Sequence, residues 1–218
     1  MNEIRTSRFI TFDDPQLKKV ILELPKLWWS RPYEYAWASS FVNEDHVVLD
    51  AACGICHPFK FYLCNLCNKV YACDLDVRLV SNKEIVKDII NVFGQEGMNF
   101  PLEYLDKPLM SLQDISNTSY TDAMFDRIIC ISVLEHLQEE NLLKTLLEFK
   151  RILKKEGLLI VTLDYPYLDL ELFNRILEKS GLLYADKVEI EMPGNVLKTN
   201  LFPEFPCGLY SFRALLKK

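Results

Sequence analysis

The sequence predicts an α/β protein built on a doubly wound, mostly parallel sheet. From residue 47 onward, short apolar runs alternate with amphipathic stretches of helical length, which is the pattern of strands joined by crossover helices. The first two apolar runs each end on an aspartate, Asp50 and Asp74. Ligands of such folds bind at the carboxyl ends of the strands, so these two acids mark the edge where a site is expected.

Residues 1–45 form an aromatic-rich N-terminal extension, and residues 46–218 form the main domain. Five large aromatic side chains between Trp28 and Trp37, together with Arg31, are too many for a solvated tail. They predict a helical segment that either covers the ligand site as a lid or simply packs on the domain.

The first half of the main domain reads as strand, helix, strand, helix. Strands are predicted at residues 47–49 and 69–73 from their apolar runs. A helix is predicted to follow Pro58, which suits a first helical turn, and a second one covers residues 79–93. A weaker strand is expected at residues 109–112.

The second half of the domain continues the alternation of strands and helices and then ends in two strand-like segments. Strands are predicted at residues 125–132 and 158–163, with a helix between them that Gly157 ends in the manner of a C′ glycine. Another helix covers residues 170–177 and is closed by Gly181. The last two segments, 187–192 and 209–216, are predicted to pair with each other as antiparallel strands, which completes a seven-stranded sheet.

Composition excludes several classes of protein. Half of the 218 residues are hydrophobic, enough for a sizeable core, and the net charge is −6 without a basic stripe, which disfavours nucleic acid as a partner. The longest nearly uncharged apolar run, residues 128–134, is far shorter than the roughly 20 residues of a membrane span. The N-terminal residues lack the apolar core of a signal peptide, and seven cysteines in a chain this long favour a reducing cytoplasm.

The strand-end acids predict the kind of ligand. Asp74 follows Asp50 by 24 positions at the tip of the second strand, where a carboxylate can accept both hydroxyls of a ribose. Residues 51–54 between them are small and allow a tight turn beneath a ligand. Together they favour an adenosine-containing ligand.

Three segments resemble class I S-adenosylmethionine-dependent methyltransferases. Residues 48–54 (VLDAACG) resemble the first motif of that family, a strand followed by D-x-G-x-G-x-G. Residues 125–137 resemble its fourth-strand block, and residues 150–161 resemble its helix-to-fifth-strand block. The resemblance implies a Rossmann-like fold and an enzyme that transfers a methyl group from S-adenosyl-L-methionine to an O, N or C nucleophile of a small molecule.

The resemblance also implies roles for single residues. The turn after the first strand is expected to hold the methionine part of the cofactor, and Asp74 the ribose. The lid would bring Arg31 to the cofactor carboxylate, Glu34 to its ammonium group and Tyr33 or Tyr35 to its sulfonium. The expected cofactor-binding residues are Asp50, Ala51, Ala52, Cys53, Gly54, Asp74, Leu75, Asp114, Ile115, Cys130, Ile131, Ser132, Arg31 and Tyr35.

The sequence departs from the family pattern at two positions. Ala52 stands where the family usually has its first glycine, and Cys56 stands where it has the last. An alanine is tolerated in this turn if its φ stays negative. The departures motivate a second hypothesis, a catalytically silent methyltransferase-like module that binds a partner protein.

Three residues are candidates for catalysis. His136 follows the fourth strand and is either a general base or a framework residue that bonds to nearby backbone. His57 follows the cofactor turn and either caps the next helix or faces the cofactor pocket. Tyr165 lies in the loop 164–168 that borders the expected substrate side.

Two rival sites are disfavoured by position. Cys53-x-x-Cys56 and Cys64-x-x-Cys67 have the spacing of a zinc site, but the second pair falls inside a helical pattern, which favours buried thiols and no metal. A dinucleotide turn needs G-x-G-x-x-G directly after the first strand, and this turn offers only Gly54. The oligomeric state is not indicated.

Overall fold

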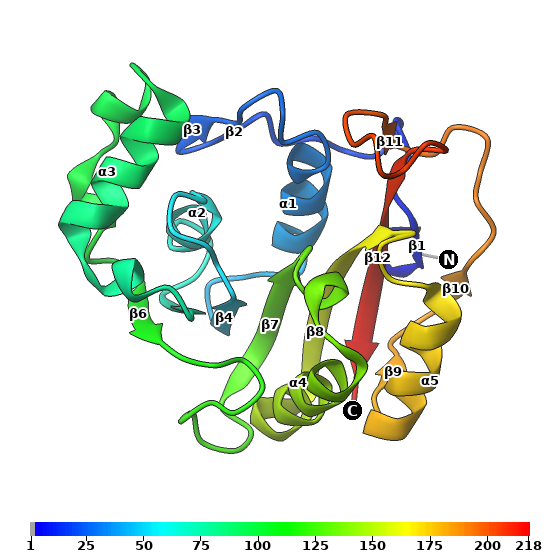
Figure 1. The fold of residues 1–218 in the computed structure, drawn as a ribbon. Helices are drawn as coiled ribbons and strands as arrows, with labels where there is room; N and C mark the ends of the chain where they lie inside the picture. The colour runs from blue at the N-terminus through cyan, green and yellow to red at the C-terminus, as the bar shows by residue number, and fades with distance from the viewer. Residues whose placement is uncertain (1–2) are drawn as a thin grey trace.

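The computed structural model describes residues 3–218 as a mixed sheet with helices on both faces (Figure 1). Its strands lie in the order β10-β1-β12-β8-β7-β4-β5-β6, while β9 and β11 pair with further parts of β12. Strands β4 to β8 run parallel and β12 runs antiparallel to β8, which confirms the predicted fold class. The strands of this sheet are β1 (Ser7–Phe9), β4 (Val47–Ala51), β5 (Lys69–Asp74), β6 (Leu109–Leu112), β7 (Phe125–Ile131), β8 (Leu153–Tyr165), β9 (Leu183–Tyr184), β10 (Val188–Glu189), β11 (Lys198–Thr199) and β12 (Leu209–Lys217).

The helices divide between the two faces of the sheet. Helices α4 and α5 pack on one face around Phe149 and Phe173, and α1 and α2 pack on the other around Trp37 and Phe59. The α-helices are α1 (Arg31–Ser39), α2 (Phe59–Leu63), α3 (Asn82–Phe93), α4 (Glu139–Ile152) and α5 (Leu170–Ser180). Short 3₁₀ turns are η1 (Glu3–Arg5), η2 (Val77–Val80), η3 (Gly97–Asn99), η4 (Leu102–Tyr104) and η5 (Leu134–His136).

Capping residues set the helix boundaries. The Ser81 side chain accepts a hydrogen bond from the Glu84 backbone N–H, so α3 begins at residue 82 rather than at the expected residue 79. Asp169 caps α5 in the same way, and Gly181 ends it in the left-handed conformation, as the sequence predicted.

The predicted role of Gly157 is wrong. Helix α4 already ends at Ile152, and Gly157 lies inside β8, the strand that follows at once. A Cβ atom at this position would stand 2.7 Å from Leu153 Cδ1 and 3.1 Å from the Asp126 carbonyl oxygen. Close packing inside the sheet, rather than helix termination, therefore explains this glycine.

The predicted pairing of residues 187–192 with 209–216 is also wrong. Strand β12 pairs with β8 from Tyr210↔Tyr165 to Leu216↔Leu159, and β10 pairs in parallel with β1 at the edge. The reason lies in burial: β12 is buried on both faces and takes an interior position, whereas the two residues of β10 are exposed or half-buried and lie at the edge.

Residues of the N-terminal extension take part in this sheet. Strand β1 pairs with β12 through Arg8↔Arg213 and Phe9↔Phe212. The chain then forms a small hairpin of β2 (Lys19–Val20) and β3 (Leu22–Glu23) before entering α1. Within residues 3–218, no helix is long and apolar enough to cross a lipid bilayer.

Candidate active site

Asp50, near the carboxyl end of β4, has a buried oxygen that is free. Its side chain is 4% exposed, and its Oδ2 atom has no hydrogen-bond partner among the described residues. Burial raises the pKa of Asp50 to about 7, the nearby Lys60 charge opposes the rise, and the Asp74 charge adds to it. A positively charged ligand group would satisfy this carboxylate.

The turn after Asp50 is left-handed at two positions. Ala52 has a φ of +54° and Gly54 a φ of +62°, so the expectation that Ala52 keeps a negative φ is wrong. A left-handed alanine costs roughly 1–2 kcal/mol. At Gly54 a Cβ atom would stand 2.6 Å from His57 Cδ2. The packing of His57 therefore requires a glycine at this position, and the sequence retains it.

Lys60 stabilises this turn from beneath. Its fully buried Nζ donates to the carbonyl oxygens of Gly54 (2.8 Å), Ile55 (2.9 Å) and His57 (2.8 Å). Sequence reasoning missed this residue because a lysine in a helical pattern is usually solvated. The three bonds replace those that water would make and hold the turn in one shape.

Asp74 connects the turn to the end of β5. Its Oδ2 accepts from the Gly54 backbone N–H at 2.9 Å, and its Oδ1 accepts from the Asp76 backbone N–H at 3.0 Å. The carboxylate is therefore held in one orientation before any ligand arrives. Each oxygen keeps a further lone pair for a ligand hydroxyl.

Two cavities adjoin at the ends of the strands. A polar one of about 100 Å³ lies over the turn, and a less polar one of about 210 Å³ lies beside Asp74. The first is lined by Arg31, Tyr35, Asp50, Ala52, Cys53, Gly54, His57, Phe59, Ile131, Ser132 and Val133. The second is lined by Ala52, Asp74, Leu75, Gln113, Asp114, Ile115, Ser116, Val133, Leu137, Asn141 and Thr145. Ala52 and Val133 line both cavities, which therefore meet.

Helix α1 brings a buried ion pair to the first cavity. Arg31 pairs with Glu34 and donates to Ser132 Oγ at 2.9 Å. The fully buried Glu34 also accepts from the hydroxyls of Ser132 (2.8 Å) and Ser211 (3.1 Å). Burial alone would raise the pKa of Glu34, but the charge and hydrogen bond of Arg31 outweigh it and lower the pKa. Glu34 is thus bonded to protein partners, whereas Asp50 keeps one oxygen without a partner among the described residues.

His57 faces the first cavity and does not cap α2. Its Nδ1 lies 2.9 Å from the Tyr35 hydroxyl, and its ring stacks on Trp28 with 4.2 Å between centroids. Burial, with help from the charges of Arg31 and Lys60, lowers the pKa of His57 to about 3. The imidazole therefore stays neutral at physiological pH and shapes the wall of the cavity.

A second pair of acids stands at the ends of β7 and β8. Glu135 is 4% exposed, its Oε1 accepts from the Asp164 backbone N–H at 3.2 Å, and its Oε2 has no partner in the described part of the chain. Burial and the Asp164 charge raise the pKa of Glu135 to about 8. Burial and the Glu34 charge raise the pKa of Asp164 to about 7, against the effect of Arg31.

Sequence reasoning missed both acids and singled out their neighbours. His136 is exposed, and its ring meets Tyr167 edge-on at 4.9 Å. Tyr165 packs against Phe9 at 5.5 Å between ring centroids. The signal for Glu135 and Asp164 was present: they lie at the ends of the fourth and fifth predicted strands, as Asp50 and Asp74 do at the first and second.

Most of the expected cofactor residues line the two cavities. Ala51 and Cys130 do not, because both are buried in the core beneath them. Burial raises the pKa of the Cys130 thiol well above its usual range, so it remains a neutral core side chain. Among residues 3–218 no group of three or more His, Cys, Asp or Glu side chains is arranged to hold a metal ion, and the seven cysteines are free.

Comparison with known proteins agrees with this geometry. Residues 49–161 match the family described as the methyltransferase domain. The chain belongs to this family. S-adenosylmethionine is accordingly the cofactor of the family, and the free Asp50 oxygen and fixed Asp74 carboxylate fit its ammonium and ribose groups.

Three relatives illustrate how far the likeness reaches. An uncharacterised protein of Methanocaldococcus jannaschii is 34% identical to this chain over 119 residues. The matched region is 55% of this chain and 41% of that protein, so the chain spans less than half the length of this relative. The TehB-like SAM-dependent methyltransferase of Corynebacterium glutamicum superposes with a TM-score of 0.58 at 18% identity, over 85% of this chain and 86% of that one. Magnesium protoporphyrin IX methyltransferase of Synechocystis, with bound SAM, gives a TM-score of 0.54 at 17% identity, over 84% and 76%. At these identities the two structures share the fold of this methyltransferase domain.

Proposed function

We propose that this chain is an S-adenosylmethionine-dependent methyltransferase that methylates an oxygen, nitrogen or carbon nucleophile of a small molecule. One observation carries the proposal: two adjoining cavities at the strand ends are lined by a buried carboxylate with a free oxygen and by a carboxylate held in place by backbone donors. The match of residues 49–161 to the methyltransferase domain supports it.

The polar cavity suits the methionine end of the cofactor. Asp50 Oδ2 accepts from the ammonium group, and Arg31, which lines the same cavity, faces the carboxylate. Tyr35, Ile131 and Ser132 form the remaining wall toward the substrate side. The cavity thus offers one acid and one base for the two charged groups of an amino acid.

The second cavity suits adenosine. Asp74 accepts from the ribose hydroxyls with the lone pairs that Gly54 and Asp76 leave free. Leu75, 66% exposed, and the buried Ile115 offer apolar surfaces to the adenine ring. Asp114, whose Oδ1 already accepts from the Ser116 backbone N–H at 2.8 Å, is the acceptor for the adenine amino group.

When bound, the cofactor supplies a methyl group whose bond to sulfur breaks, with the electron pair moving to sulfur, as the nucleophile forms its new bond to carbon. The chain contributes orientation and the exclusion of water. Holding the nucleophile and the methyl carbon about 3–3.5 Å apart in line accounts for much of the rate that such an enzyme needs. Trp28 and α1 close the cofactor cavity on the side of the N-terminal extension, since Trp28 stacks on His57 and α1 supplies Arg31 and Tyr35.

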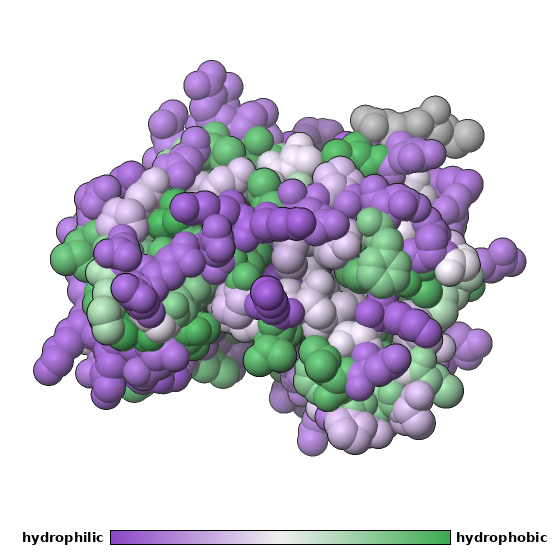
Figure 2. Space-filling model, turned by 90° about the horizontal axis from the view of Figure 1, so that it is seen from above, coloured by the Kyte–Doolittle hydropathy of each residue, from purple (hydrophilic) through white to green (hydrophobic). Residues whose placement is uncertain are grey.

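The face above the strand ends supports a small acceptor rather than a nucleic acid. Figure 2 looks onto the side where the parallel strands end and shows a hollow of weakly polar residues between hydrophilic margins. The charged groups beside the cofactor cavity are mostly acids, namely Glu34, Asp50, Glu135 and Asp164, with Arg31 among them. Among the described residues, Arg31 is the one lysine or arginine that lines either cavity, so the site lacks the row of cations that a phosphate backbone requires.

Thermal unfolding with S-adenosylmethionine tests the proposal, with NAD as the control ligand. At a hundredfold excess over Kd, binding adds about 2.7 kcal/mol to the free energy of unfolding. For a chain of this length the melting temperature should rise by roughly 5–10 °C, at about 2–4 °C per kcal/mol. Transfer of a labelled methyl group to an added acceptor would demonstrate the methyltransferase activity directly. An unchanged melting temperature at saturating cofactor would instead favour the catalytically silent binding module.

A further inference from the structure

Besides Asp50 Oδ2, two buried carboxyl oxygens near the cofactor cavity have no hydrogen-bond donor among residues 3–218. They are Glu135 Oε2, in the 3₁₀ turn η5 after β7, and Asp164 Oδ1, near the end of β8, and the two residues are linked through the Asp164 backbone N–H. Leaving a buried acceptor without a donor costs about 1–3 kcal/mol, and more when it is charged. The proposed cofactor positions use neither oxygen, so a further ligand group is the natural donor.

The charges around these oxygens favour the binding of a cation. Glu34, Arg31 and the two acids themselves are the charged groups that act most strongly on this pair. Arg31 is already paired with Glu34 and bonded to Ser132, so its charge is largely offset. In the described part of the chain, Glu135 and Asp164 are therefore left without a positive partner of their own.

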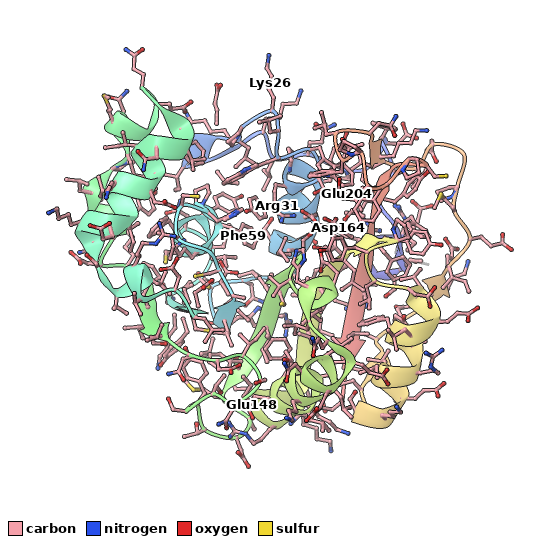
Figure 3. The ribbon with its side chains drawn as sticks, viewed as in Figure 1. Lys26, Arg31, Phe59, Glu148, Asp164 and Glu204 are labelled. Carbon is pink, nitrogen blue, oxygen red and sulfur yellow. The ribbon has the colours of Figure 1, made fainter. Side chains whose placement is uncertain are left out.

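The pair lies beside the cavity assigned to the methionine end of the cofactor. Figure 3 shows Asp164 next to Arg31 at the end of β8, and Arg31 lines the cavity assigned to the methionine end of the cofactor. Glu135 follows Ser132, another lining residue, by three positions in the short turn after β7. Tyr167, half exposed, lies with its ring centroid 5.6 Å from that of Phe205, at a tilt of 49°, and supplies aromatic surface beside the same loop, which favours a cation.

We propose that the methyl acceptor is a small amine that binds in its ammonium form, donating hydrogen bonds to Glu135 Oε2 and Asp164 Oδ1. This inference rests on the proposed function. Before attack, one N–H bond of the ammonium group breaks and its proton moves to a carboxylate oxygen of Glu135, leaving the nitrogen with its electron pair. That pair then forms the bond to the methyl carbon as the carbon–sulfur bond breaks. The bound cation favours the charged form of Glu135, and burial, which raises the pKa of Glu135 to about 8, makes that carboxylate a better proton acceptor than an exposed glutamate.

Matched probes that differ only in charge test this inference on the full chain. Benzylamine is compared with benzyl alcohol, and propylamine with propanol, by isothermal titration in the presence of saturating S-adenosylhomocysteine. We expect at least one amine to bind about tenfold more tightly than its alcohol, because hydrogen bonds to charged groups contribute about 1.5–3 kcal/mol. Benzoate, as a further probe, should not bind.

A double variant, Glu135→Gln with Asp164→Asn, identifies the groups responsible. It should lower the preference for the amine to less than about twofold while it leaves the affinity for S-adenosylhomocysteine unchanged within twofold. Glu171→Gln, on the exposed face of α5, serves as the matched control and should keep the preference.

The two proposals fail in different ways. If neither amine binds more tightly than its alcohol, or if the preference persists in the double variant, the amine site is wrong even though S-adenosylhomocysteine binds. If S-adenosylhomocysteine does not bind at all, the proposed function is wrong, and the amine preference is then scored on the cofactor-free protein.

Discussion

Replacing Asp74 with alanine should weaken cofactor binding by orders of magnitude. The carboxylate accepts from the backbone N–H groups of Gly54 and Asp76 at 2.9 and 3.0 Å, and it would add two bonds from the ribose hydroxyls. Each hydrogen bond to a charged group contributes about 1.5–3 kcal/mol, so the two ribose bonds together correspond to about 3–6 kcal/mol. The dissociation constant for S-adenosylmethionine should therefore rise roughly a hundredfold to ten-thousandfold.

Isothermal titration of wild type, Asp74→Ala and Asp74→Asn gives the comparison. The asparagine variant keeps one acceptor oxygen and should fall between the other two proteins. Asp106→Asn, an exposed aspartate away from both cavities, is the control and should bind as wild type does. Urea unfolding of each variant separates a loss of binding from a loss of fold. An Asp74→Ala variant that is folded and binds within about threefold of wild type would refute the assignment of the ribose site.

Three further outcomes follow from the geometry of the turn and its acids. Ala52→Gly should raise the free energy of unfolding by about 0.5–1 kcal/mol, because it removes a left-handed alanine at φ +54° at some entropic cost; a loss of stability in urea would contradict this. Gly54→Ala should destabilise the protein by more than about 1 kcal/mol and abolish the thermal shift by cofactor, because its Cβ would stand 2.6 Å from His57 Cδ2. The pKa of Asp50 is raised from 3.8 to about 7 in the folded protein, so its contribution to stability is full below pH 3.8 and is lost as the pH rises through 7. Melting temperatures across that range should fall less in Asp50→Asn than in wild type, and equal slopes would exclude Asp50 as a cause.

The strand-end acids were predictable from the sequence because they depend on local pattern alone. Apolar runs identify β4 and β5, and parallel strands bring their carboxyl ends to one edge, so Asp50 and Asp74 could be assigned together. The helix α5 was equally predictable, since Gly181 caps it in the left-handed conformation.

Other features depend on partners far away in the chain. Glu34 became a structural residue because Ser132 and Ser211, separated from it by 98 and 177 positions, bond to it in the fold. Gly157 looks like a helix stop in the sequence, and only the neighbouring strand reveals its tight packing. The interior place of β12 likewise follows from burial on both faces, which a run of apolar residues near the end of a sequence does not specify.

The pairing of β1 with β12 has a consequence for the order of events during synthesis. Arg213 donates to the carbonyl oxygen of Thr6 across 207 positions, and the Leu215 backbone N–H donates to Ser7 Oγ across 208. These bonds close one side of the sheet, and they form only after the last strand has left the ribosome. Until then, the edge of β8 that pairs with β12 stays open. From the synthesis of β8 until β12 emerges, the nascent chain therefore presents an unpaired strand edge rich in apolar residues, which is a segment that a chaperone would protect.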